Sequence, residues 1–448
     1  METAPSDGLG KTSAFNIRQN LGHLKSRPAF QEPLIDGVRA LAVLWVVTVH
    51  VFVIHLGVFP AEVARLWVHR PLSWIVNSTQ GVDLFFVISG FLIGSILFAE
   101  FKKTGDLRIA RFYVRRFLRL TPVYWVAMLL GLYFLHNLPN YPKWGKAQYA
   151  WANILCVNNF MPILKQYMDW CWALAIEDQF YLLLPVFILL FIRLGRGRFN
   201  IFALLMVLSV TIRFTVIHIS GLCPPFRYAF DVPSFRVFDV LYDKPWMRFG
   251  GLLAGVAGAY LKTYFLPQLR SFFARTRTVT ALSLVCLAIM AHIVSTGMGS
   301  DFFIRIPHLA RELWWALHRD VFSLCLIFVI LAAIYTPALF GGRLYRFLAW
   351  KGFYPIAQLS FSVYLMHEML FFWIFPKLGP RLARHVGALD AILLDSLVGL
   401  GLTLLFSVTL YVTIERPCMR IRSSAPVLRF IQRLERRKYL VPADAVHG

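Results

Sequence analysis

The stretch LIDGVRALAVLWVVTVHVFVIHLG, residues 34–57, decides the fold. Most of its residues are apolar, and as a helix it is long enough to cross the ~30 Å hydrocarbon core of a bilayer, which takes ~20 residues. Apolar runs of similar length recur along the whole chain. An ordinary soluble domain has no use for so many, so the sequence predicts an all-α fold whose helices cross the membrane repeatedly.

Ten apolar runs qualify as candidate spans. They lie near residues 34–57, 82–101, 120–138, 172–192, 201–220, 246–266, 279–298, 321–340, 353–377 and 392–414. The runs follow one another along the chain without clustering at either end. We therefore expect one continuous polytopic integral membrane bundle of about ten transmembrane helices.

The charge distribution predicts how this bundle is oriented. The chain has 448 residues and a formal net charge of +23, but its basic residues lie in short connectors between apolar runs. With the N-terminus in the cytosol, the cytosolic segments hold roughly twice as many Lys and Arg residues as the opposite side, the usual bias of membrane proteins. We expect both termini in the cytosol, and no nucleic-acid partner.

The segments outside the spans differ in composition. Residues 1–33 have no apolar core or small-residue cleavage site, so we expect a cytosolic segment whose following span directs insertion. Residues 418–448 are basic and amphipathic, which favours a cytosolic tail lying on anionic membrane lipid. Residues 137–170 are aromatic and interrupted by prolines, so we expect an external loop with an interfacial or re-entrant piece that could shape an acceptor site.

The six cysteines predict no metal centre. They form no CxxC pair, and several lie inside apolar runs, where a free thiol simply packs. We expect no bound metal and no disulfide framework, although a bond between Cys156 and Cys171 stays open.

Ionisable residues inside apolar runs are costly, so they are the candidates for function. Arg39 and His50 are eleven positions apart, which places them within ~20° on one helix face and ~16 Å apart along the axis. A histidine can accept and return a proton near neutral pH, and a cation can hold phosphate groups. The alternative is an interfacial Asp36–Arg39 pair and a packing histidine. We expect His55, on another face, to be structural.

The second and third spans add an acid and a basic cluster. Asp83 lies near the outer end of its span, whereas Arg115, Arg116 and Arg119 lie at the inner surface. On a helix these arginines are neighbours at spacings of three and four, which suits multidentate phosphate binding. An ordinary cluster of cytosolic positive charge is the alternative.

The fourth and ninth spans place further polar residues in the outer half of the membrane. Glu177 lies ~8–10 Å below the outer boundary, at a depth comparable with that of His50. The ninth span carries SFSVYLMHE, residues 360–368. Such carboxylate and histidine groups could also be helix–helix hydrogen bonds or the proton relay of a transporter.

Together these segments resemble the acyltransferase 3 family of bacterial inner-membrane O-acyltransferases, from about residue 34 to 417. The resemblance rests on the Arg39–His50 spacing and on four motifs in order. They are GVDLFFVISGFLI (81–93), RRFLRLTPVY (115–124), WALAIEDQFYLLLP (172–185) and SFSVYLMHE (360–368). The sequence departs slightly at Asp178, where many relatives have Glu, and the charge is kept.

The resemblance implies transfer of an acyl group, commonly acetyl, to a hydroxyl of a carbohydrate or glycoconjugate at the outer face. The donor, acyl-CoA, would bind from the cytosol, and no cofactor would be held permanently. Arg39 and His50 match the family's functional pair. Some relatives carry a soluble hydrolase-like domain after the last span, and we expect the stand-alone form, with residues 34–417 as the acyltransferase domain.

The site predicted on this basis has three parts. For catalysis we expect His50 as general base, with Glu177 or Asp83 orienting its imidazole. For donor binding we expect Arg39, Arg115, Arg116 and Arg119. For acceptor binding or support of these groups the candidates are Asp36, Trp172, Tyr181, Ser360, Tyr364, His367 and Glu368.

Two other functions stay open at this point. A secondary transporter would use the buried charges for protons or substrate, but would have broken helices in paired repeats, and none is evident in the sequence. A non-catalytic assembly partner is the third possibility. Acceptor, acyl length and a direct or acyl-histidine route are not decided by the sequence.

Overall fold

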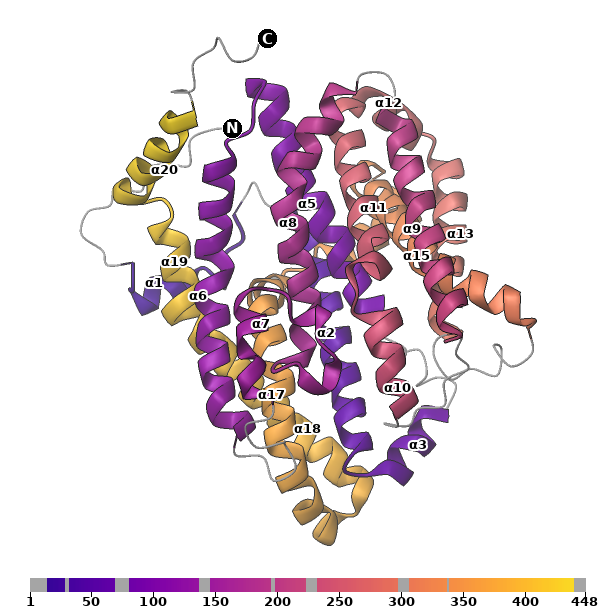
Figure 1. Cartoon of the computed structure of the whole chain (residues 1–448), viewed down its shortest axis with the longest axis vertical. Coiled ribbons are helices and arrows are strands. Elements are labelled where there is room, and N and C mark those ends of the chain that lie inside the picture. The colour runs from indigo at the N-terminus through magenta and orange to yellow at the C-terminus, as the bar shows by residue number, and fades with distance from the viewer. Residues whose placement is uncertain are drawn as a thin grey trace.

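The structure, a computed structural model, describes residues 14–28, 32–68, 80–136, 146–194, 198–222, 232–296, 306–336 and 338–438. Every regular element within these ranges is a helix. Nine of the described helices are long and apolar enough to cross a membrane, and a tenth span is reached if the bent pair α11–α12 counts as one. The predicted all-α polytopic bundle is confirmed (Figure 1).

The long helices follow the predicted spans. They are α2 (Pro33–Leu56), α5 (Gln80–Thr104), α6 (Ile109–His136), α8 (Trp172–Arg193), α9 (Arg198–Ser220), α11 (Pro245–Tyr264), α13 (Thr276–Ser295), α15 (His308–Tyr335), α17 (Phe353–Val386) and α18 (Ala388–Leu410).

Shorter helices connect them. They are α1 (Ile17–Gly22), α3 (Pro60–Val68), α7 (Ala150–Ile154), α10 (Val232–Val237), α12 (Leu266–Phe273), α16 (Arg343–Leu348), α19 (Arg416–Ile421) and α20 (Ala425–Lys438). Two single π-helical turns, η6 (Phe238–Tyr242) and η8 (Tyr411–Glu415), occur among them. Because π-helical turns often occur at functional sites, η8 is a candidate for a functional position.

Glycines let α5 and α11 pack backbone to backbone in one half of the bundle. A Cβ atom on Gly255 would lie 2.2 Å from the carbonyl oxygen of Val87, and one on Gly90 would lie 2.2 Å from that of Leu252. Both distances are far below van der Waals contact, so only glycine fits. Small residues of this kind are the usual means by which membrane helices approach closely.

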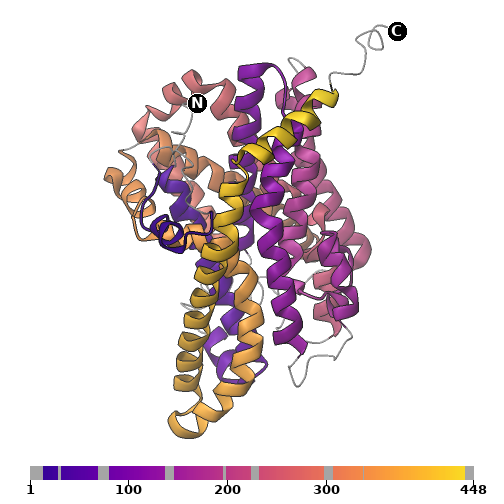
Figure 2. The ribbon, with the colours of Figure 1, turned by 90° about the vertical axis from the view of Figure 1, so that its left-hand side faces the viewer.

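The other half of the bundle is built on α17, which packs against both α2 and α18. The pair α17–α18 forms a long hairpin that extends below the rest of the molecule in the views of Figures 1 and 2. The N-terminal helix α1 meets the end of this half, because the Asn20 side-chain amide donates to the carbonyl oxygen of Val412 at 2.9 Å. Helices α19 and α20 lie against α6.

Two helices begin earlier than the apolar runs predict. Helix α6 starts at Ile109, so the arginines assigned to a connector are part of the same continuous helix as the third span. Helix α15 starts at His308 and includes buried Glu312, Arg319 and Asp320. Hydropathy places such residues outside a span, whereas in the bundle their charges are paired inside it.

Part of the segment 137–170 can be compared with its prediction. Residues 146–171 form short helical pieces between α6 and α8, and Asn153, Asn158 and Gln166 in them are buried. The segment is therefore packed on the bundle. The prolines at 139 and 142 lie outside the described residues, and its depth in the membrane stays a prediction.

Candidate active site

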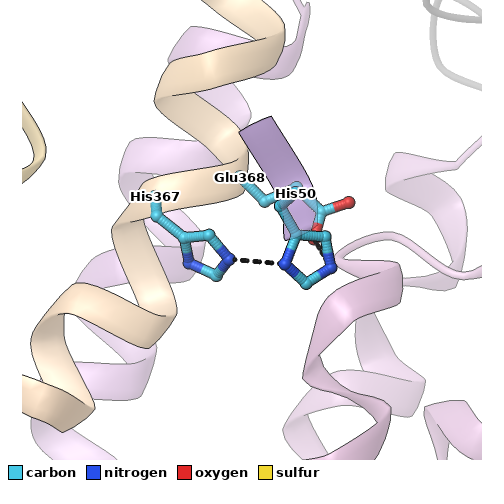
Figure 3. A group of neighbouring side chains, drawn as sticks. All are labelled: His50, His367 and Glu368. Atoms are coloured by element: carbon cyan, nitrogen blue, oxygen red, sulfur yellow. Dashed lines mark hydrogen bonds and ion pairs between the residues drawn. The ribbon is translucent and has the colours of Figure 1, made fainter. Parts of the chain in front are cut away.

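The His50 side chain points from α2 toward α17, where it meets two consecutive residues (Figure 3). Its Nδ1 atom lies 3.1 Å from Nε2 of His367 and 2.9 Å from the carbonyl oxygen of Val46. Its Nε2 atom lies 3.3 Å from Oε2 of Glu368. The His50 side chain is 22% exposed, whereas that of Glu368 is 9% exposed. His50 is thus reachable within an otherwise closed site.

The hydrogen bonds assign the protons of both rings. Nδ1 of His367 lies 2.8 Å from the carbonyl oxygen of Tyr364 and 3.1 Å from that of Val363, so it must be the donor. Its Nε2 is then an acceptor, and Nδ1 of His50 carries the proton that lies between them. The unprotonated nitrogen of neutral His50 is therefore Nε2, the atom that faces Glu368.

This arrangement suits a base that becomes a cation. Oε2 of Glu368 is buried and has no hydrogen-bond partner among the described residues, its ion-pair contact with His50 apart. A proton taken up by Nε2 of His50 would supply the missing donor and bring an imidazolium beside a carboxylate. Glu368 is thus placed to stabilise the protonated form of His50.

The same three side chains could in principle hold a metal ion, since their ligand atoms lie within 4.8 Å of one another. The facing nitrogens of His50 and His367, however, are 3.1 Å apart with a proton between them, and Nδ1 of His50 also meets the Val46 carbonyl oxygen. One nitrogen of each ring is thereby engaged in a hydrogen bond. The donor set fits a proton better than a metal.

Residues 146–171 cover this site on one side. The Tyr364 hydroxyl donates to the Trp170 carbonyl oxygen, and Lys146 pairs with Asp169 at 3.2 Å. Asp169 is close enough to both His50 and Glu368 for charge–charge interaction. An acceptor that reaches His50 from this side would therefore meet polar and aromatic groups.

A second group of charges surrounds Glu177 on α8. The Ser89 hydroxyl donates to Glu177 Oε1 at 2.7 Å, and the Tyr181 hydroxyl donates to Oε2 at 3.1 Å. Arg116 lies 4.0 Å from the same carboxylate and stacks 3.6 Å above the Tyr181 ring. Arg39 is close enough to interact electrostatically with all three of Glu177, Tyr181 and Arg116.

Arginines outnumber acids in this second group. Arg39, Arg116 and Arg119 interact electrostatically with one another. Among the described residues, neither the Arg39 nor the Arg119 guanidinium has a hydrogen bond or ion pair. The carboxylates in electrostatic range, Asp36 and Glu177 for Arg39 and Glu415 for Arg119, form no ion pair with these two arginines, so the arrangement suits binding of a polyanion.

Both members of the predicted pair on α2 therefore point into the bundle, His50 toward α17 and Arg39 toward α6 and α8. The carboxylate beside His50 is neither of the two predicted for that position, because His50 contacts Glu368 and His367, while Glu177 lies with the arginines. Tyr364 is close enough to interact with both Glu177 and Glu368 and so lies between the two groups.

Asp83 is held elsewhere. Its carboxylate bridges Arg248 at 3.1 Å and Arg319 at 2.6 Å, and all three side chains are buried. The Arg248 guanidinium also lies 4.8 Å from the Trp172 ring. The structure does not bring Asp83 to His50, and its geometry favours joining α5, α11 and α15.

Other predicted residues have structural contacts. Asp36 pairs with Arg27 at 2.9 Å, and the Ser360 hydroxyl donates within its own helix to the carbonyl oxygen of Ala357. His55 pairs with Asp395 at 2.8 Å with both side chains fully buried, which fits the structural assignment of His55.

One residue of this region was not singled out from the sequence. Glu415, in the π-helical turn η8, accepts a hydrogen bond from the Ser362 hydroxyl at 3.0 Å and interacts electrostatically with Arg119 and Arg39. A carboxylate at the very end of the last apolar run is the signal that could have found it.

A pocket of about 330 Å³ opens between α6 and α8 beside the arginine group. Its wall includes Arg116 and Glu177, and its rim includes the exposed apolar side chains of Phe117 and Leu182. Cys156 also lines it, but burial and the neighbouring Asp178 raise the pKa of its thiol to about 12. A thiol so rarely ionised is a poor nucleophile.

A helical membrane bundle with a histidine–carboxylate pair and a nearby group of arginines has the side chains of an enzyme that moves protons and charge inside the membrane. The sequence comparison defines the class further. Residues 33–412 match the acyltransferase domain family, acyltransferase 3, and the chain belongs to that family. This confirms the resemblance read from the motifs.

Curated relatives are similar over three quarters of this chain. It is 27% identical over 351 residues to the peptidoglycan O-acetyltransferase OatA of Listeria monocytogenes, covering 75% of this chain and 48% of the relative. It is 25% identical to the O-acetyltransferase OatA of Staphylococcus aureus (75% and 50%) and 24% identical to the nose resistant to fluoxetine protein 6 of Caenorhabditis elegans (75% and 44%). The chain spans about half the length of these relatives. No solved structure matches it.

Proposed function

We propose that the chain is a membrane O-acyltransferase that moves an acyl group, most simply acetyl, from acyl-CoA on the cytosolic side to a hydroxyl of a carbohydrate or glycoconjugate at the outer face. The observation that carries the proposal is the position of His50 between His367 and Glu368, on the same helix as Arg39 of the arginine group. Family membership supports acyl transfer as the chemistry.

The arginine group is the proposed donor site. Arg39 on α2 lies together with Arg116 and Arg119 on α6, and Arg115 is also on α6. Guanidinium groups bind phosphate oxygens in pairs and remain charged, so they suit the phosphates of CoA. Arg39 and His50 are ~16 Å apart along α2, which leaves room for the pantetheine arm between bound phosphates and a thioester at His50.

At the thioester, His50 acts as the general base. Its Nε2 takes the proton of the acceptor hydroxyl, whose oxygen forms a bond to the acyl carbon as the carbon–sulfur bond breaks. The proton on His50 then passes to the departing thiolate, so atoms and charge balance. Glu368 stabilises the imidazolium in between, and His367 holds the ring in the tautomer that leaves Nε2 free.

Glu177 has a different part in this scheme from the one predicted from the sequence. Because it accepts from Ser89 and Tyr181 and lies by Arg116, it holds the donor-site groups in place. A covalent route through acyl-His50 uses the same atoms in two steps. Appearance of donor-derived acyl groups on the enzyme before acceptor is added would select that route.

Two relatives are named O-acetyltransferases, one of them a peptidoglycan O-acetyltransferase, which supports a carbohydrate acceptor here. Polar and aromatic groups of residues 146–171 beside His50 suit a sugar. Three further points are parts of the same proposal. The cell inner membrane is the location that the family resemblance implies. The cytosolic termini and the contact of the basic tail with membrane lipid follow from the distribution of positive charge.

The test compares the surface glycans and glycolipids of cells that produce the protein, its His50→Ala variant, or neither, by mass spectrometry. We expect added acetyl groups with the unaltered protein alone. His385→Gln is the matched control, because His385 is an exposed histidine on α17 away from the site. Full acetylation by His50→Ala at equal membrane abundance would overturn the proposed chemistry.

A further inference from the structure

The arginine group extends beyond the residues assigned to the donor. Arg422 follows helix α19 and interacts electrostatically with Arg115, Arg119 and Arg416. Helix α19 packs against α6 (Figure 2), and the interactions of Arg422 with Arg115 and Arg119 place this segment along the arginine-bearing part of α6. The chain after the last span thus brings further positive charge to the same place.

These guanidinium groups have no direct partner. Within the described ranges, neither the Arg115 nor the Arg422 guanidinium makes a hydrogen bond or ion pair, and Glu100 is the carboxylate in electrostatic range of Arg115. Burial, together with the neighbouring Arg115 and Arg416, lowers the pKa of Arg422 below its usual value, as like charges in a confined space do. Such a cluster is stabilised when an anion occupies it.

The order of the arginines along the helices matches the order of groups in CoA. Helices α2 and α6 run in the same direction, and Arg119 lies in range of Arg39. Arg115 is one turn before Arg119, so it lies ~6 Å farther from the level of His50. In CoA the thioester, the pantetheine arm, the diphosphate and the adenosine 3′-phosphate follow one another in that sequence.

We propose that Arg422 and Arg115 bind the 3′-phosphate of the CoA donor. This inference rests on the proposed function. A phosphate monoester carries close to two negative charges at neutral pH and accepts several hydrogen bonds, which suits two guanidinium groups without other partners. The segment after the last span then selects CoA over donors that lack this phosphate.

The test measures equilibrium binding of CoA and of 3′-dephospho-CoA to the full chain in nanodiscs of neutral phosphatidylcholine, by calorimetry. Charged hydrogen bonds of this kind predict that the unaltered protein binds CoA roughly 10- to 100-fold more tightly. Arg422→Ala should remove most of this preference by weakening CoA binding, while Arg115 keeps a remainder, and should leave dephospho-CoA binding unchanged. Arg422→Lys should keep part of the preference.

The matched control is Arg429→Ala, because Arg429 is exposed on the neighbouring helix α20 and bonds within its own helix. It should leave the ratio of the two dissociation constants unchanged. Because each ratio is taken on one preparation, a partly folded sample does not imitate the effect.

Three results would overturn the inference. The first is equal affinity of the unaltered protein for CoA and dephospho-CoA. The second is a loss of affinity in Arg422→Ala and in Arg422→Lys that is the same for the two nucleotides. The third is an effect of Arg422 that appears only in nanodiscs with anionic phospholipid. The last result would assign the arginines to lipid. Failure of the proposed function looks different, since the protein would then bind neither nucleotide.

Discussion

Replacing Glu368 by glutamine tests the proton chemistry of the site with almost no change of shape. In the structure, Nε2 of His50 is the free base and Glu368 Oε2 lies 3.3 Å away. A glutamine there carries no charge to stabilise the imidazolium, and its amide would donate to Nε2 and occupy it. We therefore expect Glu368→Gln to lower kcat while leaving donor binding intact.

The size of the loss can be estimated from the distance. Two unit charges 3.3 Å apart interact by ~5 kcal/mol at an effective dielectric constant of ~20, which is an upper limit. A hydrogen bond to a charged group contributes ~2 kcal/mol. At 1.36 kcal/mol per factor of ten, kcat should fall by between ~30-fold and ~5,000-fold.

The assay follows acyl transfer by purified protein in liposomes, with CoA affinity measured on the same preparation. Glu435→Gln is a suitable control, because Glu435 lies on α20 away from the site. Unchanged kcat in Glu368→Gln would refute the assigned proton positions. A loss confined to the KM for acyl-CoA would move Glu368 to the donor site instead.

Three further predictions concern the fold. Gly255→Ala should destabilise the protein by ~1–3 kcal/mol or more, since the new Cβ meets the Val87 carbonyl oxygen at 2.2 Å, whereas Gly401→Ala, with open space around it, should leave the thermal midpoint in detergent unchanged. Asp83→Asn should lower the free energy of unfolding by ~3–5 kcal/mol and lower membrane abundance, because it leaves two buried arginines without their anion. The protein that does fold should keep its turnover. Normal stability with lost turnover would make Asp83 catalytic instead. Burial raises the pKa of Asp243 to about 7, so the native state holds a proton that an unfolded aspartate releases near pH ~4. This contribution to the free energy of unfolding is largest at low pH and is lost as pH rises through about 7. The fall in thermal midpoint between pH 5 and pH 8 should therefore be smaller in Asp243→Asn.

The fold was readable from the sequence because crossing a bilayer imposes length and hydrophobicity on each span. The same criterion misplaced the starts of α6 and α15, since it excludes charged residues from spans. In the bundle, Arg319 and Asp320 are inside α15 because Asp83 and Arg213 neutralise them. Pairing between distant helices leaves no trace in a hydropathy profile.

The sequence indicated which residues belong to the candidate site, but not which of them contact one another. Ionisable side chains inside apolar runs are costly and therefore stand out in the sequence, so His50, His367 and Glu368 were all candidates. The contact of His50 with His367 joins positions 317 residues apart, and no local pattern indicates it. Glu177 and Glu368 share a similar expected depth, so only the packing of α17 on α2 shows which carboxylate lies at the histidine.

Arg422, in contrast, was not singled out from the sequence. It lies in a basic stretch that the positive-inside bias explains without any function. The role proposed for it rests on the packing of α19 against α6, which the sequence does not show. A compositional explanation can therefore be correct and still leave a binding residue unrecognised.

The proposed reaction transfers an acyl group across the membrane, from a donor on the arginine side to a hydroxyl on the His50 side. Inverted and right-side-out membrane vesicles from cells that produce the protein test it, with labelled acetyl-CoA, which does not cross the bilayer, added outside. We expect label in lumenal glycans of inverted vesicles only, and none with His50→Ala. Label in glycans of right-side-out vesicles, or equal labelling with His50→Ala, would contradict it.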